Sequence, residues 1–256
     1  MEFQQQKLKK FLGGRKMKEF IKRILKSNCI GRGIYEILHK LYRAYNTPRK
    51  IKRLHKYGYE ALNRVHNTLS SRNIPYYCEA GTMLGIVRDN GFIKHDDDID
   101  IAIMPDIVKP VEVLKAFKDS GFGFVHGFLY EGQISEFTVS DRSGITIDVF
   151  FHKYVPNDKT RFHEVFMRWY ADRKYPEASA NTALQFNFRG ADSLKEVEVN
   201  GVTTVIPANA EEMLDSAYGP WRKPDPNFKS DSLKYIELPG FSYRITNYDD
   251  FLAKGA

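Results

Sequence analysis

An alternation of Asp and Ile inside an acidic cluster constrains the fold of this chain most strongly. Residues 96–104 read Asp-Asp-Asp-Ile-Asp-Ile-Ala-Ile-Met. Because successive side chains of a β-strand point to opposite faces, this pattern predicts a strand over 98–104. Its Ile side chains enter a core, while Asp98 and Asp100 project together from the other face. An isolated strand is not stable in water, so we expect a sheet around it.

Other segments with strand or helix patterns surround this central strand. Strands are predicted at 74–80, 123–130, 134–140 and 145–151, and helices at 54–73, 83–88, 108–118 and 161–174. Gly81-Thr82 is predicted to form the turn between the first strand and the short helix that follows. Strands and helices mixed in this order predict an α/β (α+β) domain, built on a mixed sheet with flanking helices.

Turn and capping signals predict two further elements nearer the C-terminus. Asn200-Gly201, between Val-rich segments, suits the type I′ turn of a β-hairpin. Asn209, with Glu212 three residues later, has the spacing of a capping box and predicts a helix that ends at Gly219.

The positive charge of the chain is concentrated at its N-terminus. Residues 1–56 contain 17 Lys and Arg against three Glu, a net charge of +14, whereas the whole chain carries +7. The remaining 200 residues therefore carry a net charge of −7. This distribution disfavours a body that binds nucleic acid through a broad basic face. No run of about 18 apolar residues exists, so no transmembrane helix is predicted. Lys and Arg interrupt every candidate apolar region, so a signal peptide is not predicted either.

The N-terminal arm has two apolar stripes at helical spacing. Residues 17–25 alternate apolar side chains with Lys and Arg, which predicts a basic amphipathic helix. A second stripe runs through 34–45, and Pro48 is expected to end it. Two interpretations remain open for these helices. Either they pack on the main domain, or residues 7–26 lie on an anionic membrane surface.

The acidic cluster itself points to a cation. Carboxylates this close together repel one another unless a positive charge lies among them. Asp98 and Asp100 share one face and suit a hard ion such as Mg²⁺, which binds carboxylates together with substrate phosphates. A calcium EF-hand is excluded, because its sixth and twelfth positions would hold Ile101 and Ile107 instead of Gly and Glu. A solvated acidic turn is the simpler alternative, but it does not explain the alternating Ile residues.

A third carboxylate and a phosphate-binding motif complete the pattern. Asp148 lies in the apolar strand 145–151, where an unpaired carboxylate is costly to bury, so a metal or cationic partner is expected. The alternative is an Asp that faces solvent at a strand edge. Gly81-Thr82, just before a helix, predicts a phosphate cradle of backbone N–H groups and a hydroxyl. Arg88, about two helical turns further on, can pair with phosphate oxygens.

The motifs together resemble a known family. Residues 81–88, 91–93 and 96–101 are similar to the LicD family of phosphotransferases, which includes the fukutin-type proteins and belongs to the nucleotidyltransferase-fold superfamily. Residues 218–224 resemble a shorter motif near the C-terminus of that family. The resemblance covers residues 57–226. Lys94-His95 replace a Pro-Trp that the family often has there, which leaves the substrate open.

This resemblance implies an activity and the residues that carry it. LicD-type enzymes transfer a phosphoalkyl group, such as phosphocholine or an alditol phosphate, from a CDP-linked donor to a hydroxyl of a cell-surface glycan or glycolipid. The resemblance implies Mg²⁺, with Mn²⁺ as an alternative, held by the catalytic carboxylates of Asp98, Asp100 and Asp148. The residues expected at the donor phosphates are Gly81, Thr82, Arg88 and His95. His95 is equally well explained as a packed side chain.

The chain is accordingly expected to have three parts: a basic helical arm (1–53), a LicD-like catalytic domain (54–226) and a C-terminal extension (227–256). A cytoplasmic location is expected, with attachment to the inner face of a membrane as an option. Two other functions remain open. One is a glycosyltransferase that uses Asp-x-Asp with a nucleotide sugar, although no nucleotide-binding βαβ half precedes the motif. The other is a membrane-binding module with an inactive enzyme body.

Overall fold

The computed structural model describes residues 29–167, 183–225, 236–239 and 242–255. The amphipathic helix predicted over 17–25 lies outside these residues. The chain divides into two compact units, residues 1–49 and 50–256. The division into an arm, a catalytic domain and an extension stays a prediction.

Helix α3 (Cys29–Ser70) contains the boundary between the two units. The prediction that Pro48 ends a helix is wrong, because Pro48 lies inside α3. A proline lacks the backbone N–H and crowds the carbonyl four residues earlier, which belongs to Ala44. Both residues are exposed, so water can satisfy that carbonyl. The later part of the helix is anchored by buried side chains at helical spacing, which are Leu54, Ala61, Leu62, Val65 and Leu69.

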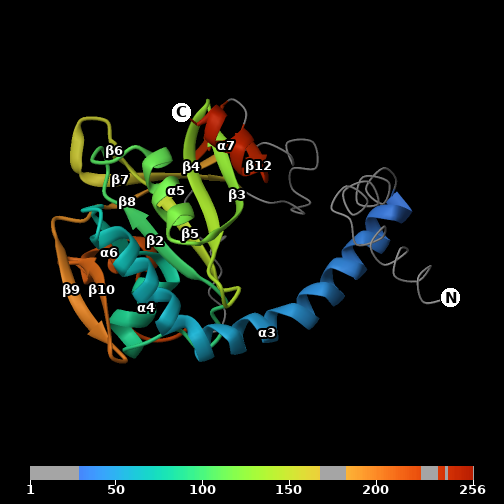
Figure 1. Cartoon of the computed structure of the whole chain (residues 1–256), viewed down its shortest axis with the longest axis horizontal. Coiled ribbons are helices and arrows are strands. Elements are labelled where there is room, and N and C mark those ends of the chain that lie inside the picture. The colour runs from blue at the N-terminus through green and yellow to red at the C-terminus, as the bar shows by residue number, and fades with distance from the viewer. Residues whose placement is uncertain (1–28, 168–182, 226–235, 240–241, 256) are drawn as a thin grey trace. The chain divides into compact units, whose positions relative to one another are not determined.

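A six-stranded mixed sheet forms the centre of the second unit (Figure 1). In spatial order its strands are β1 (Tyr76–Cys78), β2 (Ile99–Ile103), β5 (Thr146–Phe151), β4 (Gln133–Ser140), β3 (Gly123–Tyr130) and β12 (Ser242–Ile245). Strands β2 and β5 run parallel, and all other neighbours in this sheet are antiparallel. The five strands predicted around the Asp-Ile alternation are all present, and β12 is the strand of this sheet that was not predicted.

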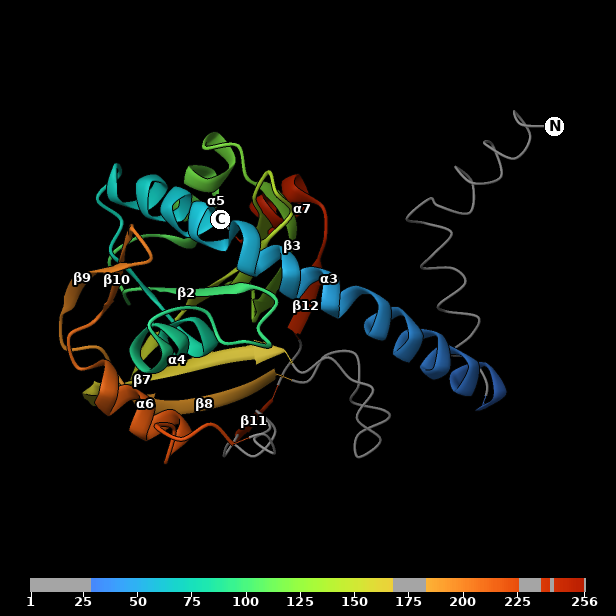
Figure 2. The same ribbon diagram turned by 90° about the horizontal axis from the view of Figure 1, so that it is seen from below.

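Both faces of the sheet are covered. Figure 2 shows α5 (Pro110–Asp119) on one side of β2, and α4 (Ala80–Asp89) with strands of a second sheet on the other. The Ile side chains of β2 are buried as the alternation predicted, with exposures of 0% for Ile99 and Ile101 and 2% for Ile103. The acidic positions of β2 therefore face the side opposite to that hydrophobic layer.

The second sheet has four strands, in the order β11 (Ile236–Leu238), β8 (Ala183–Arg189), β7 (Asp158–Met167) and β6 (Lys153–Val155). The helix predicted over 161–174 is wrong where it is described, because residues 161–167 belong to β7. Strand β7 pairs with β6 and β8, and the Phe and Val residues of this stretch favour a strand. Phe162 is fully buried, and its ring packs 6.2 Å from that of Phe188 across the pair.

The hairpin predicted around Asn200-Gly201 and the helix predicted after Asn209 are both confirmed, but the capping box predicted for that helix is absent. Strands β9 (Leu194–Val199) and β10 (Val202–Pro207) meet at Asn200 and Gly201, whose φ angles of 47° and 77° suit a type I′ turn. Helix α6 (Ala210–Tyr218) follows, but the Asn209 side chain makes no capping hydrogen bond. Its amide instead binds the Asp192 N–H and the Gly190 carbonyl, which ties the helix to the loop after β8.

The chain ends on helix α7 (Tyr248–Lys254), which was not predicted. Its first turn is capped by the Asn247 side chain, which accepts a hydrogen bond from the Asp250 N–H. Phe251 is fully buried against β3, at a place where any Cβ on Gly127 would overlap its ring. Glycine at this strand position therefore lets α7 pack on the sheet.

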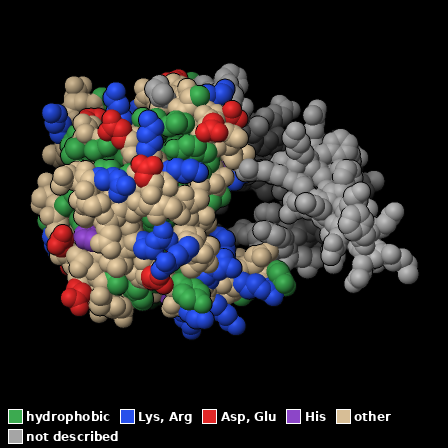
Figure 3. Space-filling view, viewed as in Figure 1, with side chains coloured by type: hydrophobic (Ala, Val, Ile, Leu, Met, Phe, Trp, Pro, Cys, Tyr) green, Lys and Arg blue, Asp and Glu red, His purple; other side chains and the backbone are tan. Residues whose placement is uncertain are grey.

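The predicted α/β architecture, a mixed sheet with flanking helices, is confirmed by this arrangement. Acidic and basic side chains both occur on the face of the second unit that Figure 3 shows. Among the described residues, no helix is both long enough and apolar enough to cross a membrane.

Candidate active site

A row of polar side chains crosses the sheet near the start of its two parallel strands. Asp100 of β2 lies directly opposite Asp148 of β5, and Asp148 lies opposite Thr138 of β4. Opposed residues of neighbouring strands, about 4.8 Å apart, project from the same face of a sheet. Asp98 lies just before β2. It is close enough to Asp148 for the negative charge of Asp148 to raise its pKa. The structure thus brings together the three carboxylates that the sequence pointed to.

Burial raises the pKa values of all three carboxyl groups, and neighbouring carboxylates raise them further. Burial, followed by the charge of Asp148, raises the pKa of Asp98 to about 7. Burial and the charge of Asp98 raise the pKa of Asp100 well above its usual range. Burial also raises the pKa of Asp148. Three full negative charges are therefore unfavourable here at neutral pH unless a cation joins them.

Two neighbouring groups offset part of this repulsion. The Thr138 hydroxyl donates a hydrogen bond of 2.5 Å to Oδ1 of Asp148, which lowers the pKa of that carboxyl. Lys50 Nζ lies 3.3 Å from Oδ2 of Asp97, and the charge of Lys50 lowers the pKa values of Asp98 and Asp148. Asp98, Asp100 and Asp148 are called the acidic row below. The Thr138 hydroxyl on the sheet and the Lys50 ammonium group of α3 both act on it.

Sequence reasoning missed both of these groups. It counted Lys50 with the basic arm, and nothing in the local sequence connects this residue to a strand 50 positions later. Thr138 did leave a signal, because it follows Glu136 by two residues in a predicted strand whose alternate positions hold Phe137 and Val139. That spacing places both polar side chains on the face of the sheet that carries the acidic row.

The predicted phosphate-binding motif lies at the start of α4. Strand β1 leads almost directly into the helix, so Gly81 and Thr82 form its first turn and the separate turn predicted there is absent. The chain bends instead at Ala80, whose φ angle is 45°. The Thr82 hydroxyl is fully buried and accepts a hydrogen bond of 2.9 Å from the backbone N–H of Asp100. This contact fixes the first turn of α4 against the acidic strand.

Asp96 packs against the same helical turn. A Cβ atom on Gly81 would lie only 2.9 Å from Oδ2 of Asp96, so glycine is what allows this approach. That Oδ2 atom is buried and has no hydrogen-bond partner among the described residues. Burial raises the pKa of Asp96 to about 6. A phosphate at this helix terminus would meet this carboxylate, so it would need a cation beside it.

Arg88 and His95 lie outside the row of Asp98, Asp100 and Asp148, but their charges lower the pKa of Asp96. Arg88 is at the C-terminal end of α4, where its guanidinium donates to both carboxylate oxygens of Asp89 at 2.9 and 2.8 Å. It also donates to the carbonyl of Trp221 at 3.4 Å. His95 is exposed. Roles for Arg88 and His95 at a donor phosphate stay predictions. Trp221 is 6% exposed and packs in the core.

Two further titratable residues lie close to the acidic row. Glu79 is the N-cap residue of α4 and is 8% exposed, and burial raises its pKa to about 7. Burial, followed by the charges of Glu79 and Asp100, raises the pKa of Tyr218 well above its usual range. The C-terminal motif therefore brings its tyrosine to the carboxylates, although the sequence had only suggested a family likeness for it.

The chemistry of these side chains suits a hard cation, because all the candidate ligands are carboxylate oxygens. Among the described residues, however, no three Asp, Glu, His or Cys side chains are already arranged as a metal site. Asp98, Asp100 and Asp148 would have to turn toward a common point when an ion binds. A bound cation would relieve the repulsion that acts on Asp98 and Asp100, and this relief would offset the cost of the rearrangement.

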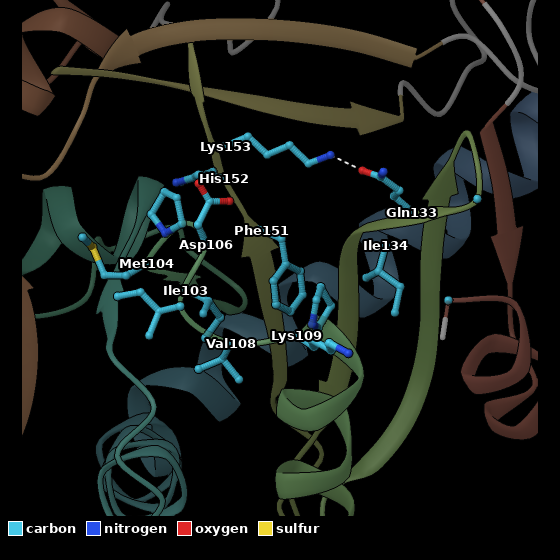
Figure 4. A pocket seen from close by; sticks show the side chains of 15 residues that line it. Ile103, Met104, Asp106, Val108, Lys109, Gln133, Ile134, Phe151, His152 and Lys153 are labelled. Carbon is cyan, nitrogen blue, oxygen red and sulfur yellow. Dashed lines mark hydrogen bonds between the residues drawn. The ribbon is translucent and has the colours of Figure 1, made fainter. Parts of the chain in front are cut away.

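A separate cavity of about 540 Å³ lies beyond the C-terminal ends of β2 and β5 (Figure 4). Residues 103–110, 132–134 and 151–153 line most of it, and Lys153 closes one edge through a hydrogen bond to Gln133. None of the predicted site residues takes part. The candidate active site is therefore the acidic row at the opposite ends of these strands.

The family of the central segment follows from a direct match. Residues 73–193 match the family described as LicD/FKTN/FKRP, nucleotidyltransferase domain. Residues 73–193 are therefore similar to a LicD-family domain. The matched segment begins before β1 and includes the first turn of α4, Asp98, Asp100 and Asp148, so the match covers the whole acidic row.

Individual relatives match over shorter stretches. An uncharacterized protein of Rickettsia typhi is 40% identical over 73 residues, which are 28% of this chain and 24% of that protein. The ribitol-5-phosphate transferase FKTN of Mus musculus is 28% identical over 92 residues, 36% of this chain and 20% of that protein. The chain thus matches about a quarter or less of the length of these relatives.

Among solved structures, the lincosamide antibiotic adenylyltransferase LnuA with bound lincomycin aligns with 57% of this chain and 77% of its own. The TM-score is 0.34 and the identity is 13%. A likeness at this level says nothing about a substrate.

Proposed function

We propose that this chain is a Mg²⁺-dependent phosphotransferase that moves a phosphoalkyl group from a CDP-linked donor to a hydroxyl of a cell-surface glycan or glycolipid. The observation that carries the proposal is the opposition of Asp100 and Asp148 on parallel strands, with Asp98 beside them, inside a segment similar to a LicD-family domain. The similarity to a ribitol-5-phosphate transferase supports transfer of an alditol phosphate, and phosphocholine is the alternative group.

In the proposed reaction, the acceptor oxygen attacks a phosphorus atom of the donor diphosphate. A new P–O bond forms, the P–O bond to CMP breaks, and the acceptor hydroxyl gives up its proton. Asp98 and Asp100 would hold the metal ion, and Asp148 would either complete its ligands or accept that proton. When bound, Mg²⁺ (or Mn²⁺) neutralises charge on the diphosphate and on the CMP that leaves.

The remaining residues of the site bind and orient the donor. The backbone N–H groups of Gly81 and Thr82 at the start of α4 face phosphate oxygens in this arrangement. Lys50 supplies a positive charge beside the acidic row. Arg88 and His95 are proposed to contact the phosphates on the outer side of α4.

A donor screen tests this function. The full chain is incubated with CDP-choline, CDP-ribitol, CDP-glycerol and UDP-sugars together with a panel of glycans, and consumed donors are identified by mass spectrometry. We expect CMP release from one CDP donor, with Mg²⁺ and not with EDTA. Asp98→Asn and Asp100→Asn should abolish it, while Asp119→Asn, an exposed carboxylate on α5, should not. Consumption of a UDP-sugar alone would instead support a glycosyltransferase.

The Asp98→Asn and Asp100→Asn variants also test whether the second unit is an enzyme. If CMP release persists at the wild-type rate in Asp98→Asn and Asp100→Asn, the proposed site is wrong. If no donor of the panel is consumed and none binds with Mg²⁺, the remaining interpretation is a binding module with an inactive enzyme body.

We also propose that residues 7–26 attach the chain to an anionic membrane surface at its cytoplasmic face. Support comes from the net charge of +14 over residues 1–56 and from the amphipathic spacing of residues 17–25. Sedimentation with vesicles tests this: binding is expected with phosphatidylserine and not with phosphatidylcholine alone. A full-length variant with Gln at every Lys and Arg of 7–26 should stay in solution, and equal binding of both proteins would refute the attachment.

A further inference from the structure

The acidic row continues one strand further than the carboxylates. His126 of β3 lies opposite Thr138 of β4, and its Nε2 is 3.2 Å from the Thr138 hydroxyl oxygen. Asp100, Asp148, Thr138 and His126 therefore form one line of side chains across four neighbouring strands. Two hydrogen bonds connect the last three of them.

The direction of these hydrogen bonds follows from counting protons. A threonine hydroxyl has a single proton, and Thr138 gives it to Oδ1 of Asp148 at 2.5 Å. While Asp148 is ionised, the contact with His126 then requires Nε2 to be the donor, so the ring carries its proton on Nε2. Nδ1 of His126 is buried with no hydrogen-bond partner among the described residues, as suits an unprotonated nitrogen. Burial and the charge of Arg244 lower the pKa of His126 to about 4, which keeps the ring neutral.

We infer that Thr138 and His126 are positioning residues that fix the carboxylate of Asp148 for the reaction. Thr138 engages Oδ1, and His126 holds the Thr138 hydroxyl in the orientation that makes this bond. Oδ2 of Asp148 is left for the metal ion or the acceptor hydroxyl. Thr138 is 4% exposed, so water cannot replace its hydroxyl without a rearrangement of the sheet. The inference rests on the function proposed above.

Substitutions at Thr138 separate a positioning role from a structural one. Thr138→Val keeps the shape of the side chain and removes the donor, and Thr138→Ser keeps the donor. Loss of a group that orients a catalytic ligand typically costs about 10- to 100-fold in activity. We therefore expect Thr138→Val to lower kcat about 10- to 100-fold at little change in KM, and Thr138→Ser to restore most of it.

Thr204 provides the matched control. It is also fully buried in this unit, and its hydroxyl lies 3.3 Å from the Tyr76 hydroxyl and 3.2 Å from Cys78 Sγ, outside the acidic row. Thr204→Val should lower Tm as Thr138→Val does, but leave kcat unchanged. If both variants lose kcat only in proportion to their folded fraction, or if Thr138→Val keeps the wild-type kcat, the positioning role is refuted.

A second measurement does not depend on activity. The ring nitrogen-15 shifts of His126, assigned by their loss in His126→Phe, report the tautomer in the protein without metal or donor. We expect a neutral ring protonated on Nε2 at pH 7, and a mixture of tautomers in Thr138→Val. A ring protonated on Nδ1, or a charged ring, would overturn the inference.

These two readouts distinguish a failure of the inference from a failure of the proposed function. A wild-type protein that turns over no donor refutes the function, and the tautomer of His126 still tests the hydrogen-bond chain. An active wild type with an unaffected Thr138→Val variant refutes the inference alone. In an active protein, His126→Phe and Thr138→Val should also be non-additive, because either change breaks the same chain.

Discussion

Replacing Asp98 by Asn is expected to change how the stability of this protein depends on pH. Burial and the charge of Asp148 raise the pKa of Asp98 from 3.8 to about 7 in the folded protein. Between these values the folded chain binds a proton that the unfolded chain has lost. The free energy of unfolding therefore falls as pH rises from 3.8 to about 7, and stays low above it.

The size of the effect follows from the same two pKa values. Each pH unit corresponds to about 1.36 kcal/mol, so this carboxyl lowers the free energy of unfolding by at most about 4 kcal/mol at high pH. Between pH 5 and pH 8 the loss is at most about 2.5 kcal/mol, because part of it has already occurred by pH 5. Water that reaches the part-exposed side chain reduces these figures.

Urea unfolding of the metal-free protein at pH 5 and pH 8 measures this loss. Other buried acids contribute to the wild-type slope, so the informative quantity is the difference between Asp98→Asn and wild type. We expect the variant to be more stable than wild type at pH 8 and to show a smaller loss between the two pH values. Asp119→Asn, which removes an exposed carboxylate, should keep the wild-type slope.

Unfolding in the presence of Mg²⁺ tests the same repulsion in a second way. If the acidic row binds the ion, Mg²⁺ should raise the stability of the wild-type protein at pH 8, since a ligand of the folded state adds to its stability. The gain should be much smaller for Asp98→Asn. A variant that is no more stable than wild type at pH 8, with an unchanged pH slope, would show that Asp98 does not repel its neighbours as inferred.

Three further outcomes are expected from other parts of the molecule. Gly85→Ala should cost about 1–3 kcal/mol in urea unfolding, because its Cβ would overlap the backbone carbonyl of Gly91, which cannot move independently. Lys50→Gln should raise the KM for the CDP donor, and the difference from wild type should shrink at high salt in initial-rate assays. Asp215→Ala removes the acceptor of the 2.8 Å hydrogen bond from Trp221 Nε1, and should lower the free energy of unfolding by about 1 kcal/mol.

Much of the fold was predictable because its signals are local. The alternation around Asp100 and the apolar runs of the following strands each encode their own periodicity, and all five predicted strands formed. Asn200-Gly201 predicted its hairpin correctly, since both residues tolerate positive φ. The two errors have different causes. Pro48 is accommodated in a long helix because it is exposed, whereas strand partners on both sides hold residues 161–167 extended.

The candidate site also has a part that the sequence could predict and a part that it could not. The sequence could identify Asp98, Asp100 and Asp148, because carboxylates among buried apolar residues are costly and therefore conspicuous. It could not assign partners to them. Lys50 reaches the row from a distant helix. The spacing from Glu136 indicated the face of Thr138, but only strand register sets its partner Asp148, so neither contact could be assigned from the sequence.

The sequence by itself determined the composition of the acidic row and the face of β2 from which Asp100 projects, because both depend only on residue type and on the two-residue period of a strand. The tertiary structure alone decided the pairing of Asp100 with Asp148 and the line that continues through Thr138 to His126. Register between strands depends on how whole layers pack, and a shift by one residue would have turned every one of these side chains to the opposite face.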